Sequence, residues 1–310
     1  MSRPLEVGVS VHDSLMQADP DRRRALLAGV EAAGLDHVTL GDHVSFHGGA
    51  GFDGLIAATA VLATHDRLRV LLAVYQLALR HPLVVARQLA SLSEVAPARL
   101  TLGVGVGGED RSEISNCGID PASRGRRLDE SLVVLRQLAT GESVTHAGEF
   151  FRLQDAAVLP PPTPRVPLVI GGSGAPAIRR TAEVGDGWVG IFCTARRFAE
   201  TRSRILDEAA RLGRSLDLFG ISVWCGLDDD PVTARDQLGR EMHALYQLPS
   251  DRLAHLTAAG TPAQVADFLA PYVAGGANVV SIVPVAGDAA EGVAMAGEVR
   301  RLLTSLDYSV

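Results

Sequence analysis

A histidine and an aspartate stand side by side where a short apolar segment of the sequence ends. Segment 37–41 is followed by Asp42 and His43, and His47 comes four residues later. An imidazole ionises near neutral pH, so His43 can donate a proton or hydrogen-bond a reduced ring. Because neighbouring side chains on a strand point to opposite sides, we expect His43 to face the site and Asp42 to face the surrounding helices. A histidine held by the backbone of a loop is the structural alternative.

A glycine-rich stretch begins at the end of another apolar segment, 99–104. Four glycines fall within residues 103–108, and Glu109 and Asp110 come next. Glycine lets the backbone approach a ligand closely, so a flat ring can lie here, with Glu109 as a weaker acid–base candidate. No helix begins directly after the glycines, so the spacing does not match a dinucleotide-binding fingerprint. A simple tight turn is the alternative.

A second glycine-rich stretch stands before a predicted helix. It consists of Gly171, Gly172, Ser173 and Gly174. Pro176 suits the first helical turn, and the free N–H groups at a helix start attract an anion. The stretch therefore predicts a phosphate cradle, with an ordinary capped helix start as the alternative. Arg179 and Arg180 follow, either as further contacts to an acidic ligand or as solvated side chains.

These stretches each follow a predicted strand, and strands alternate with helical patterns along the chain. The predicted strands are 5–11, 37–41, 68–75, 99–104, 166–171, 187–192, 218–225 and 278–283. The predicted helices are 21–33, 53–64, 83–95, 125–139, 176–184, 196–211, 262–274 and 288–306. Eight strands with a helix after each favour an α/β fold closed into a (β/α)8 TIM barrel. An open doubly wound sheet is the alternative, but it would leave its edge strands exposed.

Two segments interrupt the alternation. Segment 141–165 contains a hairpin-like pattern and three consecutive prolines, and segment 227–258 is polar and partly helical. We expect both to be excursions on a single domain spanning 1–310, with insertions after the fourth and seventh strands. In such a barrel the site is built at the carboxyl ends of the strands, where the histidine and the glycine-rich stretches stand. His81 precedes Pro82 and is expected to be structural, at the entrance of a helix.

The composition describes a folded protein that acts on a small molecule. The 310 residues are 47% hydrophobic and 21% charged, so a large core can form. The 29 basic residues are all arginine and are outnumbered by 36 acidic ones, giving a net charge of −7 without long runs of one sign. This balance disfavours nucleic-acid binding, and the absence of lysine indicates a GC-rich genome.

The cysteines, the N-terminal residues and the absence of metal-ligand motifs indicate the cellular compartment and the type of cofactor. Cys117, Cys193 and Cys225 lie far apart and form no CxxC motif, as expected of reduced thiols. The N-terminal residues lack a signal-peptide pattern and no stretch has membrane-spanning length, so we expect a cytoplasmic protein without a membrane partner. His12-Asp13 is no metal-ligand motif, and the sequence has neither H-E-x-x-H nor G-x-S-x-G. We expect no metal, and a bound organic cofactor that carries the chemistry.

The chain resembles the luciferase-like monooxygenase superfamily, and within it the oxidoreductases that use coenzyme F420. The matching segments cover most of the chain: GDH at 41–43, RLRVLLAVYQLALRHP at 67–82, ARLTLGVGVGG at 98–108, RGRRLDESLVVLRQL at 124–138, PRVPLVIGGSG at 164–174 and AEVGDGW at 182–188. Together they are specific for the superfamily and less so for F420 over FMN. An actinobacterial host, where F420 is common, fits the GC-rich composition.

The resemblance implies a luciferase-like barrel with a tricyclic ring in its mouth. Asp42 and His43 would lie beside the ring, and Ala73-Val74 would form a supporting bulge with a non-proline cis peptide. The residues that would contact the ring or its ribityl chain are Val106, Gly107 and Gly108. The residues that would hold the phosphate are Gly171, Gly172, Ser173 and Gly174.

The resemblance implies an F420-dependent oxidoreductase that transfers a hydride between the deazaflavin C5 and a small organic substrate. An FMN-dependent monooxygenase using reduced flavin and O2 is one alternative, and a non-catalytic flavin-binding protein is another. Relatives that oxidise sugar phosphates have a tryptophan in place of His47 and a glutamate in place of Gly108, so this chain departs from them unless Glu109 substitutes. Homodimers are common in such families, and the apolar helices can supply an interface.

Overall fold

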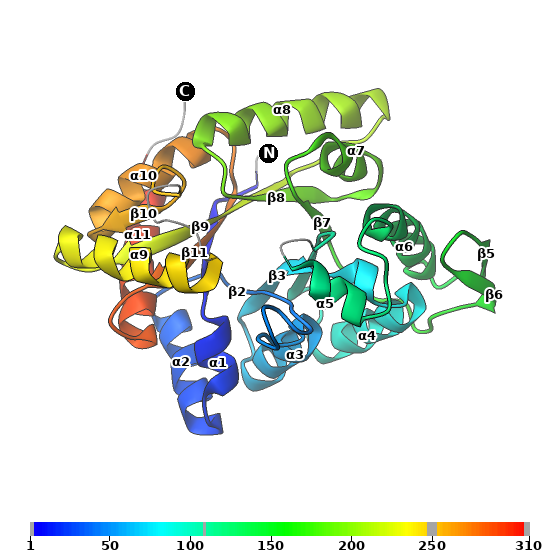
Figure 1. The fold of residues 1–310 in the computed structure, drawn as a ribbon, viewed down its shortest axis with the longest axis horizontal. Helices are drawn as coiled ribbons and strands as arrows, with labels where there is room; N and C mark the ends of the chain where they lie inside the picture. The colour runs from blue at the N-terminus through cyan, green and yellow to red at the C-terminus, as the bar shows by residue number, and fades with distance from the viewer. Residues whose placement is uncertain (1–2, 108–109, 247–252, 307–310) are drawn as a thin grey trace.

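Eight parallel strands form the centre of the molecule (Figure 1). The computed structural model describes residues 3–107, 110–246 and 253–306. In sheet order from β9 to β8 the strands are β9 (Leu218–Leu227), β11 (Val279–Val285), β1 (Glu6–Ser10), β2 (His37–Leu40), β3 (Arg69–Tyr75), β4 (Leu100–Val104), β7 (Leu168–Gly171) and β8 (Gly187–Ile191). Since β8 also pairs with β9, the sheet closes on itself. The predicted (β/α)8 barrel is confirmed, and the open-sheet alternative is excluded.

A helix follows each strand and covers the outer face of the barrel. These helices are α2 (Pro20–Ala32), α3 (Gly54–Thr64), α4 (Pro82–Val95), α6 (Arg124–Leu138), α7 (Ala175–Val184), α8 (Ala195–Arg211), α10 (Pro262–Ala274) and α11 (Ala289–Ser305). Local chemistry sets their starts: the Asp53 carboxylate caps α3, and the His81 side chain accepts the Leu83 N–H before Pro82 opens α4. The structural role predicted for His81 is confirmed.

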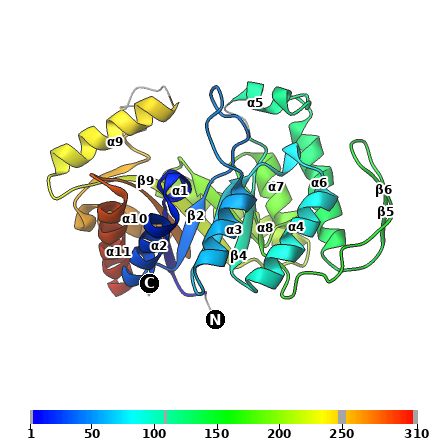
Figure 2. The same cartoon turned by 90° about the horizontal axis from the view of Figure 1, so that it is seen from below.

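The two largest excursions from this alternation lie on opposite flanks of the molecule (Figure 2). The predicted hairpin is present as β5 (Val144–Ala147) paired antiparallel with β6 (Arg152–Ala156). The insertion after β9 consists of α9 (Pro231–Tyr246) and β10 (Ala258–Gly260), which adds to the edge of β9. Short helices follow other strands: α1 (His12–Gln17), the 3-10 turn η1 (Leu77–Leu79) and α5 (Arg111–Asn116). Figure 2 shows α5 and α9 on the same side of the barrel.

The barrel interior changes from bulky to small residues toward the carboxyl ends of the strands. An inner cluster of Leu71, Val169, Val189, Leu218 and Val279 fills the lower part. In an eight-stranded barrel neighbouring strands are staggered by about one residue, so inward side chains stack in layers from alternate strands. The pairing registers put two layers of mostly small residues above that cluster. The lower contains Ser10, Ala73, Gly171 and Ser222, and the upper Gly41, Gly105, Ile191 and Val283.

The three cysteines are unpaired, as the sequence predicts. Burial raises the pKa of the Cys193 thiol to about 11 and that of Cys225 further, so both behave as small apolar side chains. In the part of the chain that the structure describes, no helix combines the length and apolarity needed to cross a bilayer. Those residues also contain no cluster of three or more His, Cys, Asp or Glu side chains suited to a metal ion.

Candidate active site

His43 faces the mouth of the barrel and is held by a buried carboxylate. Its Nδ1 lies 3.3 Å from Oε2 of Glu113, and the exposed fraction is 39% for the histidine side chain and 3% for the glutamate. Oε1 of Glu113 accepts the N–H groups of Val44 and Ser45 at 2.6 and 3.1 Å. Phe46 stacks on the imidazole with 4.2 Å between ring centroids. A proton on Nδ1 directed at Glu113 leaves Nε2 as the atom for a ligand or a proton.

The ionisation of Glu113 favours this arrangement. Burial opposes the charged form, but the Ser45 and Val44 N–H groups and the Gln76 amide donate to it and hold its pKa below the ordinary value. Glu113 is therefore a carboxylate at neutral pH, on α5, 70 residues along the chain from the histidine that it orients.

The Gln76 side chain joins Glu113 to the loop after β2. Its Nε2 donates to the backbone oxygen of Asp42 at 3.0 Å and to Oε2 of Glu113 at 3.1 Å. Reversing the amide would put an oxygen against two acceptors, so this orientation is fixed. Oε1 is buried and has no partner among the described residues, and it points at Gly107, where an added Cβ would lie 2.3 Å away. This orphaned acceptor is suited to an N–H donor of a ligand.

Asp42 has a different environment from the one that the resemblance implies. Its carboxylate is fully buried, pairs with the Arg80 guanidinium at 2.6 and 2.8 Å, and accepts the N–H groups of Gly54 and Gln76. A ring in the mouth cannot reach these oxygens, which instead tie β2, β3 and α3 together. The contacts of Asp42 agree with the predicted orientation of its side chain toward the surrounding elements.

His12 is a mouth residue that the sequence analysis did not select. It follows β1, and its Nδ1 accepts the Gly41 N–H at 3.0 Å, which places the ring proton on Nε2. Nε2 is buried and has no hydrogen-bond partner in the part of the chain that the structure describes. Burial, and the nearby His43, lower the pKa of His12, although Asp13 opposes this, so the ring is neutral at pH 7. Its position directly after a predicted barrel strand was the signal available in the sequence.

The bulge in β3 explains why residues 105 and 171 are glycines. The peptide between Ala73 and Val74 is cis, as the resemblance implies, and the pairing of β3 with β4 is irregular between Leu72 and Tyr75. A Cβ added at Gly105 or Gly171 would lie 2.6 or 2.7 Å from the Val74 side chain. Glycine is thus required at both positions to admit Val74, whatever ligand the mouth holds. Val74 itself is half-buried.

The glycine-rich stretch after β4 is described only in part. Val106 and Gly107 are half-buried, and Gly107 has a φ of +65°, which favours glycine. The predicted site residues Gly108 and Glu109 lie outside the described residues. Asp110, which comes next, accepts the His47 N–H at 2.9 Å and caps α5.

The start of α7 leaves backbone donors free. Gly174 is its N-cap and provides no side-chain cap, and Gly172 has a φ of +102°. Among the described residues, the N–H groups of Ser173, Gly174 and Ala175 find no acceptor, and all three residues are exposed. Donors at the positive end of a ten-residue helix fit a phosphate group. Gly171, the last residue of β7, lies against the Val74 side chain four residues before α7 begins.

The two arginines of α7 do not join this helix start. Arg180 is buried and its Nε donates to Asp129 on α6 at 2.6 Å, while Arg179 pairs with Asp129 and Glu183. Both side chains therefore bind α7 to α6, and Arg180 is buried and not solvated.

The family model described as luciferase-like monooxygenase matches residues 5–247, more than half of the chain. The chain belongs to this family.

Relatives of this luciferase-like chain include proteins with and without a named activity. An uncharacterized protein of Mycobacterium tuberculosis is 32% identical over 236 residues, 67% of this chain and 81% of that protein. An F420-dependent glucose-6-phosphate dehydrogenase of Beutenbergia cavernae is 34% identical over 217 residues, 66% of this chain and 63% of the relative. A solved F420-dependent secondary alcohol dehydrogenase, in complex with an F420-acetone adduct, superposes with a TM-score of 0.84 at 18% identity. That alignment covers 97% of this chain and 99% of the other.

The luciferase-like barrel has an aromatic wall on the side opposite His43. The wall consists of Ile191, Phe192, Trp224 and Tyr246. Ile191 ends β8, faces inward by register, and is 45% exposed. Tyr246, at the end of α9, makes edge-to-face contacts with Phe192 and Trp224 at centroid distances of 5.3 and 6.1 Å. This wall was not predicted, because it joins residues from two strands and an insertion.

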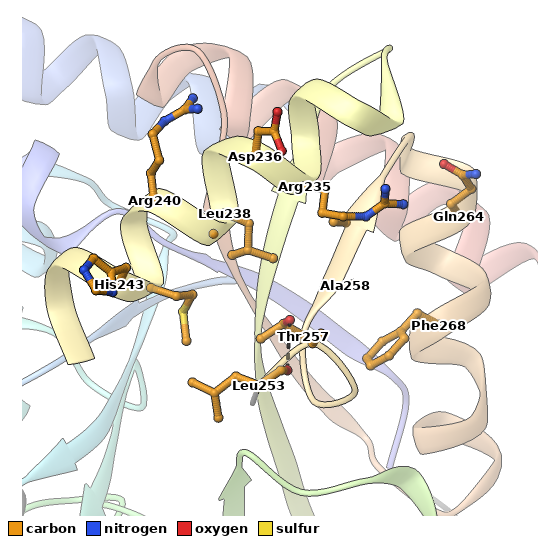
Figure 3. A pocket seen from close by; sticks show the side chains of 14 residues that line it. Arg235, Asp236, Leu238, Arg240, His243, Leu253, Thr257, Ala258, Gln264 and Phe268 are labelled. Carbon is orange, nitrogen blue, oxygen red and sulfur yellow. Dashed lines mark hydrogen bonds between the residues drawn. The ribbon is translucent and has the colours of Figure 1, made fainter. Parts of the chain in front are cut away.

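A separate hollow of about 900 Å³ lies on the other face of α9 (Figure 3). Leu238 and Met242 from α9, Leu253, and Phe268 from α10 form its apolar lining. Figure 3 shows Arg235 and Arg240 on the same helix around this lining. The hollow lies between α9 and α10. Tyr246, the last residue of α9, is not among its lining residues and contacts Phe192 and Trp224.

Proposed function

We propose that this luciferase-like oxidoreductase is F420-dependent and transfers a hydride between the deazaflavin C5 and a small organic substrate. The observation that carries the proposal is the juxtaposition of Val74, the free N–H groups of α7 and the oriented imidazole of His43 around one barrel mouth. The relationship to an F420-dependent glucose-6-phosphate dehydrogenase supports the choice of coenzyme.

The residues present fit such a coenzyme. The N–H groups of Ser173, Gly174 and Ala175 would hold its phosphate, and Val74 would support its ring. The orphaned oxygen of Gln76 would accept a hydrogen bond from a ring N–H. When bound, the deazaflavin supplies or accepts the hydride.

The protein's own contribution is the handling of a proton. Nε2 of His43 faces the mouth, so it can give a proton to a substrate oxygen or take one from it. Glu113 holds Nδ1 and stabilises the imidazolium when it forms, and Gln76 holds Glu113 in turn. His12 has its tautomer fixed by the Gly41 N–H and presents Nε2–H as a second donor.

Equilibrium titration of the purified protein with F420 and with FMN, followed by fluorescence, tests the coenzyme. We expect saturable binding of F420 in the micromolar range and much weaker binding of FMN. Binding of FMN with none of F420 would replace the proposal by an FMN-dependent monooxygenase. Binding of either without turnover of any substrate would leave a flavin-binding protein.

Ser173→Asp tests the phosphate cradle within the same titration. A carboxylate at an exposed helix start does not harm the helix, but it repels a phosphate, so F420 binding should weaken by about tenfold or more. Ser173→Asn has nearly the same shape without the charge and should bind F420 as the unmodified protein does. Equal affinities of the two variants would exclude the cradle.

A further inference from the structure

We infer that the substrate is an uncharged molecule with an aromatic or branched aliphatic body, bound against the aromatic wall of Ile191, Phe192, Trp224 and Tyr246, and not a phosphorylated sugar. The inference rests on the proposed function, because it assigns a substrate class to the same mouth. The wall is apolar, a hydroxyl without a partner among the residues described lies beneath it, and acidic side chains stand on the side opposite it.

The wall is apolar and accessible on its inner side. Trp224 and Ile191 face inward by the registers of β9 and β8, and Ile191 leaves nearly half of its surface uncovered. Phe192 has a φ of +49°, unusual for a bulky residue, which turns its ring toward Tyr246. Edge-to-face contacts hold these rings as one surface, suited to a flat or branched apolar group.

A polar atom without a partner lies beneath this wall. Ser222 faces inward two residues before Trp224 on β9 and is 6% exposed, and its Oγ is buried without a hydrogen-bond partner among the described residues. A buried hydroxyl without a partner is costly, so an empty donor or acceptor here is suited to the oxygen of a carbonyl or alcohol. The substrate then has one small polar group beside an apolar body.

The charges around the mouth disfavour a phosphate on the substrate. The wall carries no charged side chain, and the two arginines at the start of α8, Arg196 and Arg197, both pair with Glu200. On the opposite side, Asp110 and Glu113 are acidic and would repel a phosphate dianion.

Tryptophan fluorescence can read this binding without any coenzyme. The chain has two tryptophans: Trp188 is fully buried, and Trp224 stands in the wall. We expect acetophenone and cyclohexanone to quench the emission saturably, and glucose 6-phosphate to leave it unchanged at the same concentrations. In Trp224→Phe the quenching by the ketones should disappear, since the remaining indole is out of reach.

Tyr246→Ala tests whether the wall binds the ketone, with Val232→Ala as the matched control. Val232 is exposed on the same helix, away from the mouth, so its truncation should leave the ketone affinity unchanged. Loss of the tyrosine ring should weaken ketone binding by about tenfold. Quenching by glucose 6-phosphate with equal or higher affinity, or identical ketone affinities in the two variants, would overturn the inference. Because no coenzyme is present, this outcome is independent of the F420 titration.

Discussion

The two sides of the barrel mouth are built from opposite chemistries. On the side of β2 and β3, His43, Glu113 and Gln76 are joined by side-chain hydrogen bonds. On the side of β8 and β9, Phe192, Trp224 and Tyr246 contact one another through ring edges. The first arrangement fixes the position of a proton, and the second excludes water and accommodates an apolar group. We therefore propose that the β2–β3 side handles the proton and the β8–β9 side binds the substrate.

His43→Ala should have the largest effect of these substitutions, and it should change turnover without changing F420 affinity. Removal of a positioned acid–base group should slow turnover by about 100-fold or more, with F420 affinity nearly unchanged. Steady-state kinetics and the fluorescence titration together measure this separation. If turnover were unchanged, the β2–β3 side would not be the proton-handling side.

Glu113→Gln should have a smaller effect on the same side. The amide still accepts the Ser45 N–H, but it no longer stabilises a charged imidazole, so turnover should fall by about tenfold. The variant should also lose the part of the pH dependence of stability that Glu113 contributes. Because the folded-state pKa of Glu113 is lowered, the stability that this carboxylate contributes is present above its ordinary pKa and lost as the pH falls through the folded value.

Thermal melts from pH 7 to pH 3 measure this pH dependence. Glu113→Gln should show a shallower decrease of Tm with acidification than the unmodified protein. Parallel curves would show that the carboxylate is not stabilised in the folded chain.

Ser222→Ala should weaken ketone binding on the aromatic side of the mouth by a few-fold. The hydroxyl has no partner within residues 3–107, 110–246 and 253–306, so its removal should leave the free energy of unfolding unchanged or slightly higher. If it binds the substrate oxygen, ketone affinity should fall by about fivefold, a typical loss for one neutral hydrogen bond. Denaturant titration and tryptophan quenching measure the two quantities. Unchanged affinity would remove Ser222 from the substrate site.

Replacement of His37 should have the smallest effect at neutral pH, and it should change the stability of the fold in acid. It lies inside the barrel, bonded to Ser281, and burial lowers its pKa to about 4. Since the unfolded chain binds this proton near pH 6.5 and the folded chain does not, stability should fall as the pH drops from about 6.5 to 4. In His37→Asn this part of the decrease should be absent in chemical denaturation at each pH. An identical pH profile would contradict the buried neutral histidine.

The elements of the barrel could be predicted because their signals are local. Apolar runs for strands, helical periodicity, and starts such as His81-Pro82 depend on neighbours in the chain, and all eight strands and their helices were found at nearly the observed bounds. The cis peptide before Val74 followed from the family resemblance and not from the residues themselves.

The partners of the site residues could not be predicted, because barrel closure chooses them. Asp42 was expected beside the ring, but Arg80 from another loop holds it. Glu113, which orients His43, is in a short helix of polar sequence that nothing local marks as functional. The sequence by itself determined a (β/α)8 barrel with a histidine and a glycine-flanked helix start at its mouth. Only the tertiary structure decided which carboxylate serves that histidine and which rings face it, since such contacts join residues far apart in the chain.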